Sequence, residues 1–253
     1  VMAAGAILGK TPAIAALFAA LWLAMPAAIW ALDRRPPKEK PRPDERELLE
    51  DIAERTWAFF ETFAGEGRGY IPPDNFQQEP EKRPAVNTSP TNIGMAMAAA
   101  VSAAELGLIT ADELEKRLSG TMDTVDKMQK WHGHLYNWYR TDTLEVMRPR
   151  YVSTVDSGNF CACLITGSMA LKKYGREDTA ARLERAARET DFSALYDAER
   201  KLFRIGYDGD ACELSNSWYD LLASEARLTS LIAVALGSVK PEHWFKLGRQ
   251  MAP

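Results

Sequence analysis

Residues 155–174 read VDSGNFCACLITGSMALKKY. Small and apolar residues occur on nearly every side of this stretch, which has the length of a helix of about five turns. A helix that is apolar all round must be enclosed by other helices, whereas an amphipathic helix turns a charged face to solvent. We therefore expect residues 155–174 to form an inner helix that is covered by amphipathic ones.

Amphipathic and apolar segments alternate on both sides of this stretch. The amphipathic segments lie at residues 47–63, 111–131 and 177–192, and the apolar ones begin near residues 91, 155 and 218. A long polar loop precedes each apolar segment, so the three loops should meet at one end of the molecule. Paired outer and inner helices favour an all-α fold, an (α/α)6 toroid of which residues 47–253 would form about the first half. An ordinary helical bundle would satisfy the same periodicity.

Local signals refine three of these segments. Thr110 is the expected N-cap of the second amphipathic helix. The loop after the third amphipathic helix contains enough Tyr, Phe and Ile for a short hairpin. The third apolar helix should run from about residue 218 to residue 236.

The chain begins with a different kind of segment. Residues 13–32 carry no charge and are long enough to cross a hydrocarbon core of about 30 Å, so residues 11–32 are predicted to be a transmembrane helix with the lipid bilayer as partner. A signal peptide or a buried helix is the alternative. Residues 33–46 are Pro-rich and charged and should form an extended linker. Six Lys and Arg residues in it, against Lys10 alone before the apolar run, place the rest of the chain in the cytoplasm.

Composition excludes several classes of function. Lys and Arg total 31 against 35 Asp and Glu, a net charge of -4, which argues against nucleic acid as a partner. Three Cys residues are too few for a disulfide framework, and we expect them to be thiols. The sequence lacks GxxxxGK, GxGxxG and GxSxG patterns, so no nucleotide cofactor and no serine nucleophile is expected. His132 and His134 could bind a metal, but no further ligand cluster accompanies them, so we expect no metal site.

The three polar loops are rich in aromatic and carboxylate residues, a mixture that suits carbohydrate because aromatic faces stack on pyranose rings while polar groups bind the hydroxyls. The alternative is that the aromatic side chains only anchor the loops to the core. The residues of these clusters are Tyr70, Asp74, Asn75 and Phe76; Tyr136, Asn137, Trp138, Tyr139 and Tyr151; and Asp208, Trp218, Tyr219 and Asp220.

Two carboxylates differ from the others in their context. Asp156 opens the second apolar helix, where the helix dipole favours its ionised form, although it could equally be an N-cap or a first-turn acid. Glu225 is flanked by Leu221, Leu222 and Leu228, so in a continuous helix it should be desolvated and suited to donate a proton in glycoside chemistry. A Glu paired with a buried Arg is the alternative interpretation.

Seven motifs, in this order, resemble the glucoamylase-like middle region of the bacterial cyclic β-1,2-glucan synthases. The motifs are RTWAFFETF (55–63), IPPDNFQ (71–77), NTSPTNIG (87–94), GHLYNWY (133–139), RYVSTVDSGN (150–159), YDLLASEARL (219–228) and PEHWFKLGR (241–249). The resemblance implies an (α/α)6 fold, a protein of the bacterial inner membrane, and transglycosylation or hydrolysis of β-1,2-glucan.

The resemblance also suggests roles for individual residues. It implies that Glu225 is catalytic, by acid/base chemistry, and that the second catalytic carboxylate lies beyond residue 253. It implies substrate binding by Asp156, and shared roles are expected for Asn159, Trp138, Tyr139 and Arg227, with Asp74 and Tyr219 from the loop clusters.

The remaining expectations concern how much of the protein this chain covers. The chain is expected to be a fragment, continuous with missing domains, inactive alone and poorly soluble because the faces of its inner helices are uncovered. Two rival functions stay open at this point. One is a non-catalytic, membrane-anchored glucan-binding module, and the other is a tethered helical scaffold for protein partners.

Overall fold

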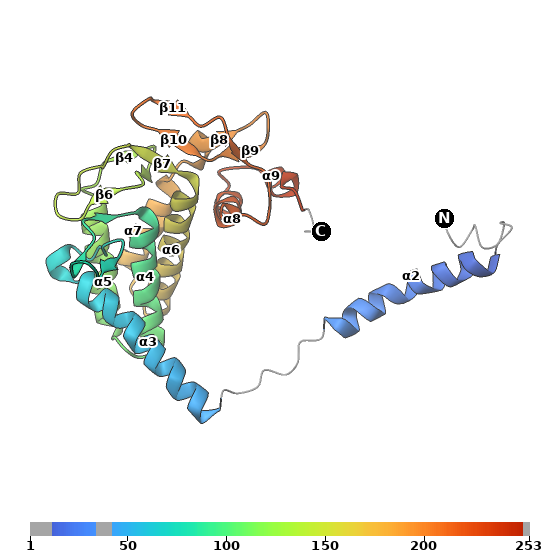
Figure 1. Ribbon diagram of the computed structural model, residues 1–253, viewed down its shortest axis with the longest axis horizontal. Helices are drawn as coiled ribbons and strands as arrows, with labels where there is room; N and C mark the ends of the chain where they lie inside the picture. The colour runs from blue at the N-terminus through green and yellow to red at the C-terminus, as the bar shows by residue number, and fades with distance from the viewer. Residues whose placement is uncertain (1–11, 34–41, 250–253) are drawn as a thin grey trace. The chain divides into compact units, whose positions relative to one another are not determined.

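The computed structural model describes residues 12–33 and 42–249. The chain divides into two compact units, residues 1–49 and 50–253, and we describe each by itself. The first unit contains α2 (Pro12–Leu32) and the start of α3 (Pro43–Phe63). All the strands and the other helices belong to the second unit (Figure 1).

Helix α2 forms where the apolar run predicts a helix, with exposed Leu17, Trp22 and Trp30 side chains. In the described ranges, no helix combines the length and the apolar character that crossing a bilayer requires. The predictions of a transmembrane helix at residues 11–32 and of a bilayer partner are therefore not supported.

The predicted linker at residues 33–46 lies mostly outside the described residues, and its last part is helical. Helix α3 starts at Pro43, four residues before the predicted residue 47. Proline is well suited to the first helical position, because the N–H that it lacks has no partner there anyway. The Glu45 carboxylate accepts a hydrogen bond from the backbone N of Arg42 (2.9 Å), which closes the first turn.

The second unit is built from helices, with short strands at one end of them (Figure 1). Its remaining helices are α4 (Pro90–Glu105), α5 (Ala111–Val125), α6 (Thr154–Lys173), α7 (Glu177–Glu189), α8 (Arg227–Ala235) and α9 (Glu242–Lys246), with 3-10 turns η1 (Glu66–Arg68) and η2 (Phe192–Leu195). The boundaries of α4 and α6 agree within one residue with the predicted apolar helices. Both the mostly helical fold and the position of the loops at one end are confirmed.

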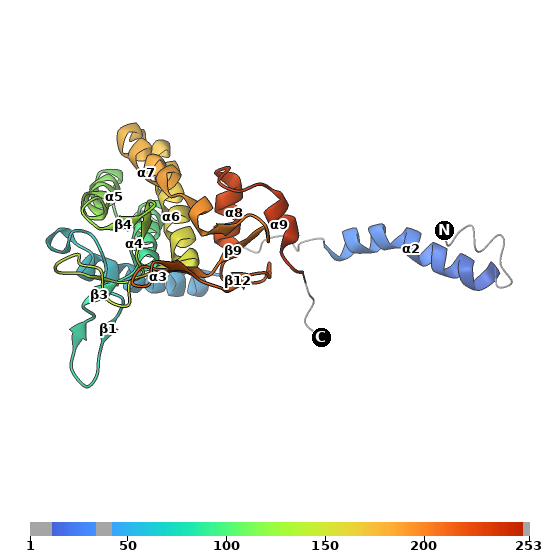
Figure 2. The same cartoon turned by 90° about the horizontal axis from the view of Figure 1, so that it is seen from above.

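Helix α6 is the inner helix that its composition predicts. It packs against α4, α7 and α8, which surround it in Figures 1 and 2. Cys161, Leu164 and Leu171 on α6 are fully buried. Gly158 lets α8 approach closely, because a Cβ atom there would overlap the side chain and backbone of Thr229.

Helices α5 and α7 are outer helices, and both are shorter than predicted. The Thr110 hydroxyl caps α5 by accepting from the backbone N of Glu113 (3.2 Å), as expected. The helix ends at Val125 instead of residue 131, since the Lys130 ammonium binds the carbonyl oxygen of Val125 (2.6 Å) and the chain then turns into a hairpin. Helix α7 ends at Glu189, three residues before the predicted end.

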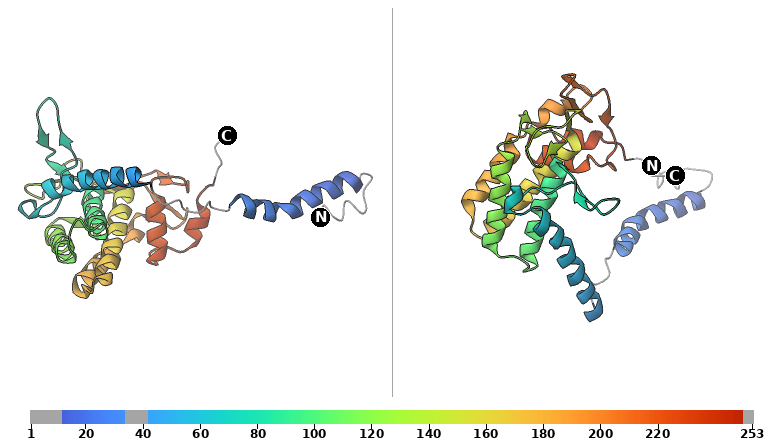
Figure 3. Two further views of the ribbon diagram at one scale, coloured as in Figure 1. Left: turned by 90° about the horizontal axis from the view of Figure 1, so that it is seen from below. Right: turned by 60° about the vertical axis from the view of Figure 1, so that its left-hand side comes forward.

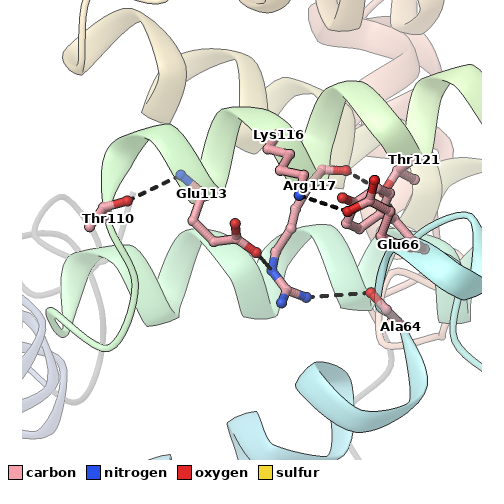
Figure 4. A network of polar contacts seen from close by, with 8 residues as sticks. Ala64, Glu66, Thr110, Glu113, Lys116, Arg117 and Thr121 are labelled. Atoms are coloured by element: carbon pink, nitrogen blue, oxygen red, sulfur yellow. Dashed lines mark hydrogen bonds and ion pairs between the residues drawn. The ribbon is translucent and has the colours of Figure 1, made fainter.

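A polar network joins α5 to the end of α3. Figure 4 shows the Arg117 guanidinium between the Glu113 carboxylate (2.7 Å) and the carbonyl oxygen of Ala64 (3.4 Å). The same guanidinium lies 4.8 Å from the ring centroid of Trp57, a buried residue of α3. This cation–π contact and the hydrogen bonds hold together the outer helices of the first two helix pairs.

Short antiparallel strands make up the loop end. They are β1 (Phe76–Gln77), β2 (Arg83–Pro84), β3 (Asn87–Thr88), β4 (Lys130–Trp131), β5 (His134–Leu135), β6 (Tyr139–Arg140), β7 (Tyr151–Ser153), β8 (Tyr196–Asp197), β9 (Leu202–Arg204), β10 (Gly206–Asp208), β11 (Glu213–Leu214) and β12 (Trp218–Tyr219). The sheets pair β1 with β2, β3 with β6, β4 with β5, β10 with β7 and β11, and β9 with β8 and β12. The β1–β2 hairpin projects from this end (Figure 3), and the predicted hairpin after α7 is confirmed as β8–β9.

The third apolar helix is where the prediction is wrong. Trp218 and Tyr219 form β12 and pair with Arg204 and Phe203 of β9, and α8 begins only at Arg227. Pairing with β9 satisfies the backbone of this aromatic pair, and tertiary contacts thereby override the apolar helical pattern. The segment between β12 and α8 is anchored instead by a backbone hydrogen bond from Leu222 N to the carbonyl oxygen of Gly248 (2.9 Å).

Candidate functional site

A chain of three polar side chains links the N-terminal turns of α4 and α6. Thr91 of α4 donates its hydroxyl proton to Oδ1 of Asp156 on α6 (2.6 Å), and Asn159 donates from Nδ2 to the Thr91 hydroxyl (3.1 Å). All three residues are half-buried. The structure thus joins Asp156 and Asn159 through a residue that the sequence did not single out.

Separate residues cap the two helices, which leaves these side chains available. Ser153 caps α6 by accepting from Asp156 N (3.2 Å), and Ser89 caps α4 by accepting from Asn92 N (3.2 Å). Asp156 is therefore a first-turn acid and not an N-cap. Its position near the positive end of the α6 dipole stabilises a carboxylate. Within residues 42–249, no hydrogen bond is made to its second oxygen, Oδ2, which leaves that atom open to a ligand.

Asp74 lies beside the start of α4. Its Oδ1 accepts from Nδ2 of Asn92 (2.8 Å), the residue that follows Thr91, and its Oδ2 accepts from Nδ2 of Asn75 (3.0 Å). Asp74 is exposed. The loop before α4 therefore adds a second polar group next to the Thr91–Asp156 pair.

Glu225 does not lie inside a helix. It is exposed in the bend that precedes α8, so the expected desolvation within an apolar helical stripe is wrong. Its Oε1 instead accepts a hydrogen bond from the hydroxyl of Tyr219 (3.0 Å). The alternative interpretation paired Glu225 with a buried Arg. In the structure its side-chain partner is Tyr219 instead.

The Tyr219 phenol interacts with both Glu225 and Asp156. Burial raises the pKa of the Tyr219 phenol well above its usual range, and the hydrogen bond and negative charge of Glu225 raise it further. Tyr151 and Asp156 contribute smaller increases in the same pKa. Backbone hydrogen bonds from Thr154 N to the carbonyl oxygen of Ile205 (3.2 Å) and from Ile205 N to that of Ser217 (3.0 Å) join the start of α6 to the chain just before β12. Asp156, Tyr219 and Glu225 therefore lie in one region at the loop end.

Tyr139 belongs to the core and not to this region. Its side chain is fully buried, and its hydroxyl donates to the carbonyl oxygen of Gln129 (2.5 Å) while accepting from Tyr136 N (2.8 Å). Burial accordingly raises the pKa of the Tyr139 phenol above its usual range. The structure contradicts the expectation that Tyr139 binds sugar directly, because its side chain is buried and anchors the loop to the core.

Trp138 and Arg227 are accessible and make no hydrogen bond to the Asp156 group. Trp138 is half-buried in the loop between β5 and β6, and Arg227 is exposed at the first position of α8. Across residues 42–249, no hydrogen bond connects either side chain to Asp156, Asn159 or Thr91.

Two residues of the site, Thr91 and Asn92, were missed from the sequence. A usable signal was present in NTSPTNIG, because Ser89 followed by Pro90 is an N-cap and first-position signature. That signature places Thr91 and Asn92 in the first turn of an inner helix, the position that Asp156 occupies on α6.

Metal ligands do not cluster in the part of the chain that the structure describes, where no group of three or more His, Cys, Asp or Glu is present. Nε2 of His134 lies 2.9 Å from the carbonyl oxygen of Asp191, and burial lowers the pKa of His134 to about 4. His134 therefore packs as a neutral ring. Cys161, Cys163 and Cys212 are thiols, as expected.

The arrangement of helices defines the fold class, which is that of glucoamylase-like proteins. A β-1,2-glucanase from Parabacteroides distasonis superimposes with a TM-score of 0.68 at 16% identity, over 81% of this chain and 30% of that one. An endo-β-1,2-glucanase from Chitinophaga pinensis gives 0.66 at 15% identity, over 75% and 47%. A candidate glucoamylase from Bacteroides fragilis gives 0.63 at 14% identity, over 79% and 49%. At these identities the likeness establishes the fold.

Sequence comparison is more specific. The chain is 31% identical to the cyclic β-(1,2)-glucan synthase NdvB of Rhizobium meliloti, over 96% of this chain and 13% of that protein. The resemblance to cyclic β-1,2-glucan synthases that the seven motifs indicate is confirmed. A model of a family described as a protein of unknown function (DUF3131) matches residues 51–163. The chain spans a small part of the length of this relative and less than half of each of these solved structures.

Proposed function

We propose that the chain is the first half of a glucoamylase-like (α/α)6 domain that acts on β-1,2-glucan by carboxylate chemistry, either transglycosylating or hydrolysing it. The similarity to a β-1,2-glucan synthase and the fold shared with two β-1,2-glucanases support this substrate class. In this proposal residues 47–253 form three outer and inner helix pairs, and polypeptide continuous with the chain supplies the rest.

The observation that carries the proposal is the grouping of Asp156, Tyr219 and Glu225 at the loop end. Two carboxylates of different character share one region there. Asp156 is half-buried and held by Thr91, whereas Glu225 is exposed and held by Tyr219. Glycoside chemistry needs a carboxylate at the reacting bond and polar groups that hold the sugar beside it, and Glu225 and Asp156 suit these two parts.

Roles follow from these environments. We assign Glu225 to the catalytic step, since its Oε2 accepts no hydrogen bond within residues 42–249 and so is free to meet a substrate. Asp156 and Asn159 bind sugar hydroxyls, and Asp74, Trp138 and Arg227 extend the binding surface. The second catalytic carboxylate comes from the remaining half of the domain.

Exposed apolar side chains support the half-domain interpretation. On α4 and just after it, Met95 and Leu106 are 52% and 64% exposed, and on α8 and α9, Leu231 and Phe245 are 50% and 76% exposed. Met95 and Leu106 also line an apolar groove of about 320 Å³ between α3 and α4. Surfaces of this kind on helices at both edges of a unit are expected where further helices would cover them.

The test uses the full-length protein that carries this chain and measures turnover of linear β-1,2-glucan. Glu225→Gln should abolish turnover and leave glucan binding within about twofold, because Gln keeps the shape and loses the charge. Glu213→Gln, which changes an exposed Glu of β11, is the matched control and should be fully active. Unchanged turnover in Glu225→Gln, with glucan still bound, would instead identify a non-catalytic glucan-binding module.

A further inference from the structure

We infer that Tyr219 is a positioning residue: it holds Glu225 in place for the reaction and does not itself bind the sugar. This inference rests on the proposed function, since it assigns Tyr219 a part in that reaction. It replaces the substrate-binding role expected for Tyr219 from the sequence.

The hydrogen bond between the two side chains is the first step of the argument. The Tyr219 hydroxyl donates to Oε1 of Glu225 at 3.0 Å. A phenol has one proton to donate, and this contact already uses it. An exposed Glu on a bend would otherwise sample several rotamers, and fixing such a side chain costs up to about 2 kcal/mol of entropy. Tyr219 supplies the contact that selects one rotamer.

Tyr219 can do this because its own position is rigid. It pairs with Phe203 in the β12–β9 ladder, and Phe203 is fully buried. The neighbouring Trp218 donates from its indole N–H to Asp197 (3.0 Å), and the Arg200 guanidinium lies 4.2 Å from the Trp218 ring centroid. These contacts tie β12 to the core, so the phenol is presented from a fixed strand.

The backbone around Glu225 is also held. Gly248 N donates to the carbonyl oxygen of Asp220 (2.7 Å), and Leu222 N donates to that of Gly248 (2.9 Å). Arg227 N donates to the carbonyl oxygen of Ser224 (3.2 Å). Because the backbone is anchored on both sides of Glu225, only the side-chain torsions of Glu225 remain to be fixed. The hydrogen bond from the Tyr219 phenol fixes them.

The electrostatics agree with this assignment. Burial, and then Glu225 itself, raise the pKa of Tyr219 well above its usual range, so the phenol stays protonated and remains a donor at every working pH. The contact occupies Oε1 and leaves Oε2 as the oxygen that meets the substrate.

The first experiment observes the pair directly, without any activity. The 253-residue chain is labelled with ¹³Cζ-tyrosine, and Tyr219→Phe identifies one of the eight tyrosine resonances. Glu225→Gln should move that resonance, because a phenol that donates to a carboxylate is polarised more than one that donates to an amide. Glu213→Gln is the control and should leave it in place. A Tyr219 resonance that is unchanged in Glu225→Gln overturns the inference.

The second experiment measures β-1,2-glucan turnover and glucan binding by variants of the full-length protein. Tyr219→Phe should lower kcat between about 10-fold and 100-fold with KM nearly unchanged, as expected when a catalytic group is misplaced. In a Glu225→Gln background, which binds glucan without turning it over, the same change should leave the Kd for glucan unchanged. Tyr207 is a half-buried tyrosine that stacks on Trp131. Tyr207→Phe is the control and should keep the wild-type kcat.

The outcomes separate the inference from the function on which it rests. A raised KM with unchanged kcat in Tyr219→Phe, or weaker glucan binding when Tyr219→Phe is added to Glu225→Gln, means that Tyr219 binds sugar and overturns the inference. Absence of wild-type turnover overturns the proposed function and the positioning role with it, whereas the tyrosine resonance still reports whether the pair exists.

Discussion

Thr91 and Asp156 join the two inner helices α4 and α6 through one hydrogen bond of 2.6 Å between the Thr91 hydroxyl and Oδ1 of Asp156. Thr91 also accepts from Asn159, so its hydroxyl is at once a donor and an acceptor. The three side chains therefore depend on one another, and Thr91 determines which carboxylate oxygen of Asp156 stays open.

Thr91→Val should disrupt this chain while keeping the shape of the side chain. Asp156 and the Asn159 amide would each lose a partner in a half-buried position, which costs about 1–3 kcal/mol of unfolding free energy. Urea unfolding measures that loss. Thr166→Val, which removes an exposed hydroxyl bonded within α6 itself, should change stability by less than about 0.5 kcal/mol. Equal losses in both variants would contradict the linking role of Thr91.

Gly158→Ala tests the contact between α6 and α8. A Cβ atom at residue 158 would overlap Thr229, whose hydroxyl also donates to the carbonyl oxygen of Thr154 (3.0 Å). We expect a loss of about 1–3 kcal/mol of stability because a packed interface must separate. Gly67→Ala places its Cβ in open space and should be nearly neutral. A thermal unfolding midpoint that is lowered equally in both variants would argue against a close approach of the two helices.

The buried His134 side chain should make the free energy of unfolding depend on pH. Burial holds the pKa of His134 at about 4 in the folded chain, below its ordinary value of 6.5. The unfolded state therefore binds the proton more readily, so the contribution is complete above about pH 6.5 and is lost as the pH falls towards 4. This one residue should lower the unfolding free energy by about 2 kcal/mol at pH 5 relative to pH 8.

The measurement is urea unfolding at pH 8 and pH 5. His134→Gln should reduce the difference between the two pH values, whereas His132→Gln, at an exposed ring, should retain it. A difference that is the same in wild type and in His134→Gln would show that other groups cause the acid sensitivity.

The sequence predicts the helices well where burial and charge alternate with the helical period. This holds for α4 and α6, whose apolar residues extend round the helix, and for the charged faces of α5 and α7. It fails between residues 218 and 226, where an apolar pattern resembles a helix but Trp218 and Tyr219 pair with β9. A pairing across fourteen or more residues leaves no local trace in periodicity, which explains the error over Glu225.

The site was predictable in part for a related reason. Asp156 and Asn159 are visible because they open a helix that the pattern identifies. Thr91 lies in the equivalent turn of α4, but a threonine there carries no signal until the two helices are known to pack together. Tyr139 illustrates the opposite error, since an aromatic residue in a polar loop looks the same in sequence whether it meets a ligand or the core.

Tyr139→Phe separates these two interpretations of Tyr139. Loss of the hydroxyl removes the acceptor of Tyr136 N and the donor to the carbonyl oxygen of Gln129, both in the interior. Because buried groups left without partners cost about 1–3 kcal/mol, we expect lower stability in urea. Affinity for β-1,2-gluco-oligosaccharide in the folded fraction, measured by calorimetry, should be that of wild type. Weaker sugar binding with unchanged stability would restore Tyr139 to the binding surface, since a hydroxyl that anchors the loop cannot be removed without an effect on folding.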